Sequence, residues 1–290
     1  MPGAYGVSGG TFGDVAEDGA VIVRAPATSA NLGPAFDCAA VALDLWNELE
    51  VTDGEGVVVE GEGAGELPAD LTNLAVRAYA LVSDAIDKRF HFVNRIPLER
   101  GLGSSAAAIA LGLAAAAPEV EPERLLAVGV VLEGHADNLA AALVGGMTLT
   151  WDGRIARIAD TLPLAPIAVV PHERTSTAVA RGVLPAALPH AEAAANAARA
   201  AMLGAAAAAG DPVLFAAALD DRLHEPYRPS HVLETVRDLL PEGAAGATLS
   251  GSGPTVIVWA EKVEPCVREL RRRFPEHAVL PLAIVPRGAL

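Results

Sequence analysis

Cysteine, aromatic residues and long apolar runs are scarce in this sequence, and each shortage excludes a class of protein. The two cysteines, Cys38 and Cys266, stand far apart without a CxxC pattern, which excludes a disulfide framework and favours free thiols. No run approaches the roughly 18 apolar residues of a membrane span. Residues 1–18 lack the basic start and apolar stretch of a signal peptide. We therefore expect a cytoplasmic protein that does not bind a membrane.

Lysine is also rare, and the overall charge is strongly negative. Lys88 and Lys262 are the only lysines, and the formal net charge is -15. Nucleic acids and anionic membranes are bound through a basic footprint, so this charge disfavours both as partners. High acidity with few lysines is typical of proteins from a salty cytoplasm, which predicts a halophilic protein. A coding bias towards acidic residues is the alternative.

The order of the expected strands and helices predicts an α+β fold. With 52% hydrophobic residues but only 4% aromatic ones, the core must be built from Ala, Val and Leu. Strands are predicted at these ranges: Val21–Arg24 (stopped by Pro26), Glu48–Val51, Gly56–Glu60, His91–Ile96, Met147–Trp151, Arg154–Ile158, Ile167–Val170, Ala247–Leu249, Val256–Trp259 and Val279–Val285. Helices are predicted at these ranges: Asn73–Ile86, Ser104–Ala116, Pro122–Leu132, Asn138–Val144, two within Ala186–Leu219, Val232–Leu240 and Val263–Phe274.

Two local signals suggest how these elements connect. The turn residues Asp53 and Gly54 predict a hairpin between the strands on either side of them. The segment Thr161–Pro166 has the composition of a crossing between domains. We therefore expect a flexible tail at 1–20, an N-terminal domain at 21–162 and a C-terminal domain at 163–290.

The strongest chemical signal is a glycine-bearing loop before an alanine-rich helix, over Pro97–Ala107. Gly101 and Gly103 allow the backbone to approach a ligand closely, because they carry no side chain. The helix that follows adds free N–H groups and a partial positive charge, and together these make a phosphate cradle. Ser104 and Ser105 can cap the helix or offer hydroxyls to phosphate or magnesium. A plain helix cap is the alternative for this segment taken alone.

With its neighbours, this loop resembles the phosphate loop of the GHMP kinase superfamily, and other segments resemble homoserine kinases within it. Six motifs occur in the family's order: Ala25–Asp37, Pro97–Ala107, Glu133–Asn138, Thr177–Pro185, Asp221–Arg228 and Ser250–Thr255. The resemblance covers about residues 21 to 285. It implies a two-domain fold with a ribosomal-S5-domain-2-like N-terminal domain and a ferredoxin-like C-terminal domain.

The resemblance also implies two binding sites. The ATP-binding residues it implies are Asn73, Pro97, Leu98, Glu99, Arg100, Gly101, Leu102, Gly103, Ser104, Ser105, Ala106 and Ala107. The substrate-binding residues it implies are Asn31, Asp37, His135, Asn138, Arg181 and Arg228. Homoserine is a zwitterion, so the two arginines suit its carboxylate and Asp37 its ammonium. Surface ion pairs for the arginines, and helix caps for Asn73 and for Asp137 or Asn138, are the alternatives.

The implied catalytic residues are Asn138 and Arg181, and the implied magnesium ligands are Ser105 and Glu133. The superfamily supplies a glutamate from the helix before the central motif, but its usual place falls between Ala127 and Val131, where this chain has no acid, and Glu133 is the only acid in Leu125–Glu133. We expect Glu133 to take over this role; the alternatives are a metal held mostly by ATP and water, and Glu133 as an ordinary exposed helix end. Mevalonate-type relatives carry an aspartate where this chain has Asn138. An amide cannot accept a proton at neutral pH, so Asn138 would orient the acceptor hydroxyl, and its proton would go to the phosphate itself.

We therefore expect an enzyme that moves the terminal phosphoryl group of ATP, with Mg²⁺, onto the hydroxyl of L-homoserine. The product would be O-phospho-L-homoserine, on the route to threonine. A related kinase for another small alcohol, such as shikimate or an isoprenoid alcohol, is the alternative. A non-catalytic ligand-binding relative is a third hypothesis, which the intact glycine loop disfavours. A homodimer is compatible with the sequence, which does not fix the oligomeric state.

Overall fold

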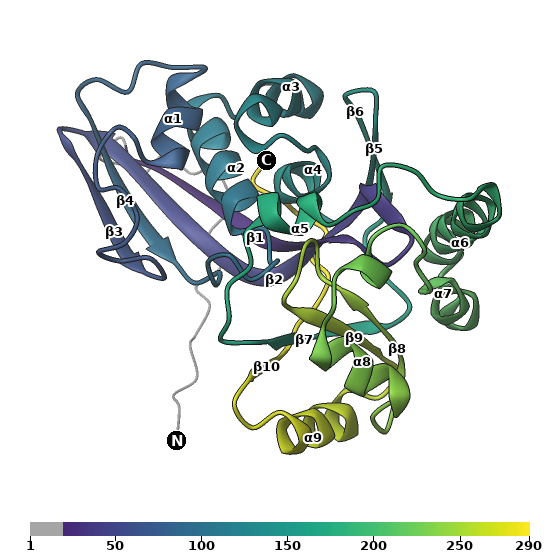
Figure 1. The fold of residues 1–290 in the computed structure, drawn as a ribbon. Helices are drawn as coiled ribbons and strands as arrows, with labels where there is room; N and C mark the ends of the chain where they lie inside the picture. Colours follow the sequence, from purple (N-terminus) through teal and green to yellow (C-terminus); the bar gives the residue numbers. More distant parts are fainter. Residues whose placement is uncertain (1–19) are drawn as a thin grey trace.

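The computed structural model describes residues 20–290, and the expected tail at 1–20 lies almost wholly outside this range. The described chain forms two sheets, each partly covered by helices (Figure 1). The first sheet has six strands in the order β3-β4-β2-β5-β6, with β1 paired to β2. The second has four strands in the order β10-β7-β9-β8. The α+β prediction is therefore confirmed.

The first sheet is built on two long antiparallel strands, β1 (Val21–Asn31) and β2 (Ala35–Asp53). The expectation that Pro26 stops the first strand is wrong. The strand continues because Pro26 lies at a shift of register, where the ladder tolerates a residue without an N–H. The short strand expected at Glu48–Val51 is likewise only part of β2.

The expected hairpin across Asp53 and Gly54 is also wrong. The strand after this turn, β3 (Gly56–Gly61), does not pair with β2, because β4 (Lys88–Asn94) lies between them. β4 is antiparallel to β2 and parallel to β3. Phe90 is fully buried in this position, so apolar burial outweighs the local turn signal in setting the strand order.

Four helices cover one face of the first sheet, and the second of them follows the glycine-bearing loop (Figure 1). They are α1 (Leu74–Ala80), α2 (Ser104–Ala116), α3 (Pro122–Glu133) and α4 (Asp137–Val144). A hairpin of β5 (Met147–Trp151) and β6 (Arg154–Ala159) follows, and both strands were expected there. α1 is shorter than the expected Asn73–Ile86, and Ile86 is largely exposed.

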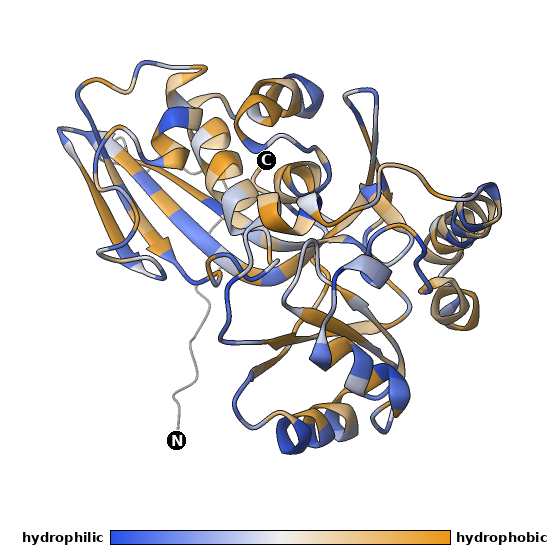
Figure 2. Cartoon of the chain, in the orientation of Figure 1, coloured by the Kyte–Doolittle hydropathy of each residue, from blue (hydrophilic) through white to orange (hydrophobic). Residues whose placement is uncertain are grey.

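The second sheet has the strand order and helix placement of a ferredoxin-like unit. Its elements are β7 (Ala165–Val170), α5 (Thr177–Gly182), α6 (His190–Ala209), α7 (Pro212–Ala218), the 3₁₀ helix η1 (Glu225–Tyr227), α8 (His231–Asp238), β8 (Ala244–Leu249), β9 (Val256–Ala260), α9 (Val263–Arg273) and β10 (Ala278–Pro281). Its paired strands are all antiparallel, and α8 and α9 pack on this sheet. Figure 2 shows hydrophilic residues on the outer side of α9.

The end of the chain returns to the first sheet (Figure 1). The last strand ends at Pro281, earlier than the expected Val285. Ile284 then forms a bridge with Leu43 of β2, and the Ala289 N–H donates to Ala142 of α4 at 2.8 Å. The final residues thus tie the two sheets together. Within residues 20–290, no helix combines the length and apolarity that crossing a bilayer requires.

Candidate active site

The loop between β4 and α2 can be built only with glycine at two positions. Gly101 and Gly103 have φ values of 77° and 67°, a region that favours glycine. A Cβ on Gly103 would lie 1.9 Å from Thr28 Oγ1, and one on Gly101 would lie 2.3 Å from the Ser250 carbonyl oxygen. The loop therefore passes between β1 and the turn after β8, and both domains hold it in place.

The start of α2 offers free backbone donors. The Ala107 N–H makes the first hydrogen bond of the helix, to the Gly103 carbonyl at 2.9 Å. No side chain caps the helix. The N–H groups that precede Ala107 thus lack an intrahelical acceptor and carry the positive end of the helix dipole. This is the arrangement of an anion cradle, and the helix-cap alternative for Ser104 is not supported.

Two cavities meet at this helix start. The first, about 250 Å³ in volume, lies between the domains, and we call it the acceptor cavity. The second, about 300 Å³, lies beside α1 and is lined mainly by apolar groups such as Leu67, Pro68 and Leu111. Glu99, Ser104 and Ser105 line both cavities. A molecule with an apolar base and a phosphate chain can occupy the second cavity with its phosphates at the start of α2.

An ion pair crosses the acceptor cavity. Arg181 of α5 donates from Nη1 and Nη2 to Asp37 of β2, at 2.9 and 2.6 Å. Both side chains are 37% exposed. Asp37 has a positive φ of 56°, and its N–H donates to Asn31 Oδ1 at 3.0 Å. The Asn31 amide also donates to the Gly251 carbonyl at 2.9 Å, so Asn31 ties the Asp37 loop to the second domain.

Arg228 is the other arginine of this cavity, and its surroundings differ. Its side chain is buried, with 6% of the residue exposed. Nε donates to the Ala180 carbonyl, and Nη1 to His224 Nδ1 and the Gly251 carbonyl. The acceptors that the described residues offer to Arg228 are thus all uncharged, and Nη2 has none among them. A buried cation that faces a cavity without a paired anion is suited to bind one.

Comparisons with known proteins identify the family. Residues 73–146 match the model of the GHMP kinase N-terminal domain, and residues 202–276 match that of the C-terminal domain. A homoserine kinase from Clavibacter michiganensis subsp. michiganensis is 43% identical over 259 residues, which cover 82% of each chain. One from Streptomyces coelicolor is 40% identical over 264 residues, covering 83% of this chain and 85% of that one. The chain belongs to the homoserine kinase branch of the GHMP kinases.

A solved structure agrees with this assignment. The homoserine kinase of Cytophaga hutchinsonii superimposes with a TM-score of 0.81 at 25% identity, covering 99% of both chains. The two-domain GHMP kinase fold expected from the sequence is therefore confirmed. The protein is a kinase that phosphorylates an alcohol.

The GHMP kinase phosphate loop contributes only part of its expected residues to the cavity walls. Leu98, Glu99, Gly101, Gly103, Ser104 and Ser105 line one or both cavities. Pro97, Arg100, Leu102, Ala106 and Ala107 are not among the residues that line either one. Arg100 instead donates to the carbonyls of Pro171 and His172, at 2.9 Å each, and so fixes the loop to the end of β7.

Asn73 lies on the wall of the second cavity, where it also caps α1. Its Oδ1 accepts the Ala75 N–H at 3.0 Å, and its Nδ2 donates to the Pro68 carbonyl at 2.9 Å. Both ends of the amide are thus engaged by the protein. The helix-cap interpretation accounts for the side chain in this structure.

The expected metal ligands are adjacent. Ser105 Oγ donates to Glu133 Oε2 at 2.6 Å, beside the start of α2. Burial raises the pKa of Glu133, although the Ser105 hydroxyl and nearby His135 oppose the shift. Within residues 20–290, no cluster of three acidic, histidine or cysteine side chains could hold a metal alone. A hydroxyl and a carboxylate fit Mg²⁺ when phosphate oxygens and water complete its ligands.

Asn138 and Asp137 stand at the start of α4, on the acceptor cavity. Asn138 Oδ1 accepts the Thr28 hydroxyl at 2.7 Å, which leaves Nδ2 to contact a ligand. Asp137 lines the cavity as well. It is 3% exposed, and burial raises its pKa to about 6. His135 lines the cavity too, and burial lowers its pKa.

Sequence reasoning also missed Thr28, Phe36 and His224. Thr28 and Phe36 lie inside the opening motif, and Phe36 lines the cavity, so their position in the motif was an available signal. His224 lies inside the Asp221–Arg228 motif. Nothing in the sequence indicates that its ring contacts a loop 191 residues earlier in the chain.

Proposed function

We propose that this protein transfers the terminal phosphoryl group of ATP to the side-chain hydroxyl of L-homoserine. The product is O-phospho-L-homoserine, a precursor of threonine. Relatives of about 40% identity named as homoserine kinases support the acceptor, and the two cavities that meet at the phosphate loop support the reaction. The apolar cavity would hold the adenosine part, and the phosphates would lie along the start of α2.

The observation that carries the acceptor assignment is the buried, unpaired guanidinium of Arg228 in the same cavity as Asp37. An α-amino acid presents one carboxylate and one ammonium a short distance apart. Arg228 would take the carboxylate and Asp37 the ammonium. Shikimate and mevalonate carry a carboxylate but no ammonium, so either would leave the Asp37 charge without a ligand partner.

The ion pair between Arg181 and Asp37 fits the same ligand. When a zwitterion enters, its ammonium can replace Arg181 as the partner of Asp37, and its carboxylate can replace Asp37 as the partner of Arg181. Each charge keeps an opposite partner through the exchange. The desolvation cost of the exchange is therefore smaller than for a ligand that carries only one charge.

Phosphoryl transfer would then depend on positioning, because Asn138 stands where mevalonate-type relatives carry an aspartate, and its amide cannot accept a proton. Thr28 holds Asn138 through Oδ1, so Nδ2–H would donate to the acceptor oxygen and orient it. The hydroxyl proton would pass to the transferred phosphate. Arg181 would contribute to transfer by holding the substrate carboxylate, and so by fixing where the hydroxyl lies.

We further propose that Ser105 and Glu133 hold Mg²⁺ together with the phosphates of ATP. When bound, the ion neutralises charge on the phosphate oxygens. A nearby cation would also keep the buried Glu133 carboxylate ionised, against the effect of burial on its pKa. The two free cysteines support a cytoplasmic location, and the net charge of -15 supports a protein adapted to high salt.

A phosphate-transfer assay across homoserine, shikimate, mevalonate and galactose tests the proposal. We expect ADP release and a phosphorylated product with homoserine. With the other alcohols we expect a kcat/KM at least about a hundredfold lower, which corresponds to about 2.7 kcal/mol. Faster turnover of shikimate or mevalonate than of homoserine would overturn the acceptor assignment. No turnover of any alcohol would overturn the reaction.

A further inference from the structure

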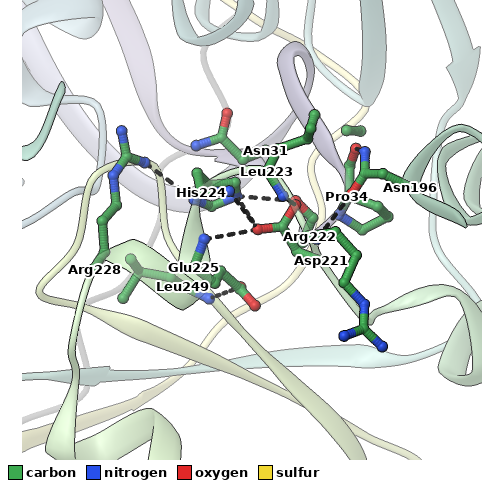
Figure 3. A network of polar contacts seen from close by, with 12 residues as sticks. Asn31, Pro34, Asn196, Asp221, Arg222, Leu223, His224, Glu225, Arg228 and Leu249 are labelled. Carbon is green, nitrogen blue, oxygen red and sulfur yellow. Dashed lines mark hydrogen bonds and ion pairs between the residues drawn. The ribbon is translucent and has the colours of Figure 1, made fainter. Parts of the chain in front are cut away.

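A buried histidine, His224, contacts Arg228 of the acceptor cavity and the turn that leads into Asp37. Figure 3 shows its contact with Arg228. His224 has 0% of its surface exposed. Its Nδ1 lies 3.1 Å from Arg228 Nη1, and its Nε2 lies 2.9 Å from the carbonyl oxygen of Gly33. Gly33 belongs to the turn that leads into Asp37. One imidazole ring therefore joins the loop of the ammonium-binding acid to the carboxylate-binding arginine.

The two partners fix the protonation state of this ring. A guanidinium can only donate, so Nδ1 must accept from Arg228. A carbonyl oxygen can only accept, so Nε2 must carry the proton and donate to Gly33. The ring is therefore neutral, in the Nε2–H tautomer. A second proton, on Nδ1, would face the N–H of Arg228 and break that contact.

Burial of the ring favours the same state. Burial, the largest cause, lowers the pKa of His224 to about 4, and the Arg228 charge acts in the same direction. Asp221 and Asp37 act in the opposite direction, as does the hydrogen bond to Gly33. Asp221 Oδ2 lies 3.6 Å from Nε2.

The backbone that carries the ring is also held rigidly (Figure 3). The Asp221 carboxylate accepts three N–H groups of its own turn, from Leu223, His224 and Glu225, at 2.7 to 3.0 Å. The Glu225 carboxylate accepts the Leu249 N–H of β8 at 2.7 Å. The ring thus projects from a turn that is anchored to the second sheet.

Phe36, next to Asp37, completes the arrangement. Its ring stacks on His224, with centroids 5.2 Å apart and an angle of 29° between the planes. The guanidinium carbons of Arg181 and Arg228 both lie 5.5 Å from its centroid. The faces of one aromatic ring therefore meet both cations and the histidine that holds one of them.

We propose that His224 is a positioning residue, whose neutral ring holds Arg228 at a fixed place relative to the Gly33–Asp37 loop. The spacing between the carboxylate-binding and ammonium-binding groups is then set by this ring, and with it the preference for an α-amino acid acceptor. The inference rests on the proposed function, because it assumes that Arg228 binds the substrate carboxylate.

Two substitutions of His224 test the contact of Nδ1 with Arg228 and the contact of Nε2 with Gly33 separately. The amide of His224→Asn reaches the place of Nδ1, so its oxygen can still accept from Arg228. The amide of His224→Gln reaches the place of Nε2, so it can still donate to Gly33 but leaves Arg228 without this acceptor. We expect His224→Gln to raise the KM for homoserine about tenfold or more, and His224→Asn to raise it much less, while the KM for ATP stays within about twofold in both. Arg222→Ala, which removes an exposed ion-pairing side chain nearby, is the matched control.

The outcomes are distinct. Equal increases in the KM for homoserine in the two variants, or increases that ATP shares, would show a merely structural role and overturn the proposal. If the wild-type protein does not phosphorylate homoserine, the proposed function fails first, and this inference falls with it. Nitrogen-15 NMR of the wild-type protein gives a second test that needs no folded variant. We expect one neutral Nε2–H imidazole that takes up no proton down to about pH 5. A protonated ring, or the Nδ1–H tautomer, would overturn the proposal.

Discussion

Gly103 shows how a single residue can determine whether phosphate binds. Alanine there would place a Cβ 1.9 Å from Thr28 Oγ1, and would displace the hydroxyl that holds Asn138. We expect Gly103→Ala to weaken ATP binding about tenfold or more, measured by titration with a fluorescent nucleotide.

Gly210 is a closely matched control. It has the same φ of 67° as Gly103 and ψ within a degree, 30° against 29°, but no atom lies within 4 Å of the place that a Cβ on Gly210 would take. Gly210→Ala therefore introduces the same backbone strain, about 1–2 kcal/mol, without the clash. Equal loss of ATP affinity in the two variants would contradict the role given to the phosphate loop.

The lowered pKa of His224 predicts how the free energy of unfolding depends on pH. Its pKa in the folded protein, about 4, lies below the ordinary 6.5, so the unfolded chain binds this proton first as the pH falls. The stability it contributes is thus complete above about pH 6.5 and is lost on acidification towards pH 4. Between these values, the unfolding free energy of wild type should fall more steeply than that of His224→Gln, by up to about 1.4 kcal/mol per pH unit.

Chemical denaturation at several pH values measures this difference. The raised pKa values of Asp137 and Glu225, about 6 and about 7, act in the opposite direction. Both groups are present in wild type and variant, so they largely cancel in the comparison. Parallel pH profiles for the two proteins would show that His224 is not held neutral by the fold.

For single residues, the motifs predicted which side chains lie together in the acceptor cavity, but not which of them form ion pairs. Asn31, Asp37, Asn138, Arg181 and Arg228 all line the acceptor cavity, as the resemblance implied. The sequence could not tell that Arg181 is paired with an acid while Arg228 is not. That difference depends on burial and on carbonyl groups from Ala180 and Gly251, which only the folded chain brings together.

At the scale of elements, α1 and α2 pack against each other beside the apolar cavity. Gly112 of α2 faces α1, and a Cβ there would lie 2.1 Å from the Ala75 carbonyl oxygen. We expect Gly112→Ala to force the helices apart at a cost of about 1–3 kcal/mol, which lowers the Tm by several degrees. Because Ala75 also lines the apolar cavity, ATP affinity should fall as well.

Gly204 in the interior of α6 has nothing within 4 Å of its Cβ position and serves as the control. Gly204→Ala should raise stability by about 0.5–1 kcal/mol, because alanine favours a helix more than glycine does. Thermal melts of both variants measure the difference. A Gly112→Ala protein as stable as Gly204→Ala would show that the helices are not packed this closely.

The places of helices and strands were better predicted than the pairing of the strands, and the reason is physical. The pattern that predicts a helix is local, and Ser104–Ala116 was expected with the bounds that the structure shows. Strand partners depend on distant residues. The turn at Asp53 and Gly54 is a sound local signal, yet β4 joins from more than thirty residues later and takes the place beside β2. The shift of register beside Pro26 also cannot be predicted from the sequence.

For the whole molecule, the net charge of -15 predicts a dependence on salt. Repulsion between like charges destabilises the compact state, and salt weakens it as the Debye length falls from about 10 Å at 0.1 M to about 3 Å at 1 M. We expect the Tm and the activity both to rise over this range of KCl. If both are highest at low salt, the acidic composition reflects coding bias rather than adaptation.

The homoserine assignment depends on Arg228 and Arg181 binding the substrate carboxylate, and this is tested by removing each arginine and the carboxylate, separately and together. The measurement is kcat/KM for homoserine and for its amide, in wild type and in Arg228→Ala and Arg181→Ala. Charge-assisted hydrogen bonds contribute about 1.5–3 kcal/mol each, so each substitution should cost about ten- to a hundredfold on homoserine. The amide has no carboxylate, so it should be a poor substrate for wild type and nearly indifferent to either substitution, while the KM for ATP stays constant. Equal losses on homoserine and on its amide would contradict the claim, because neither arginine would then recognise the carboxylate.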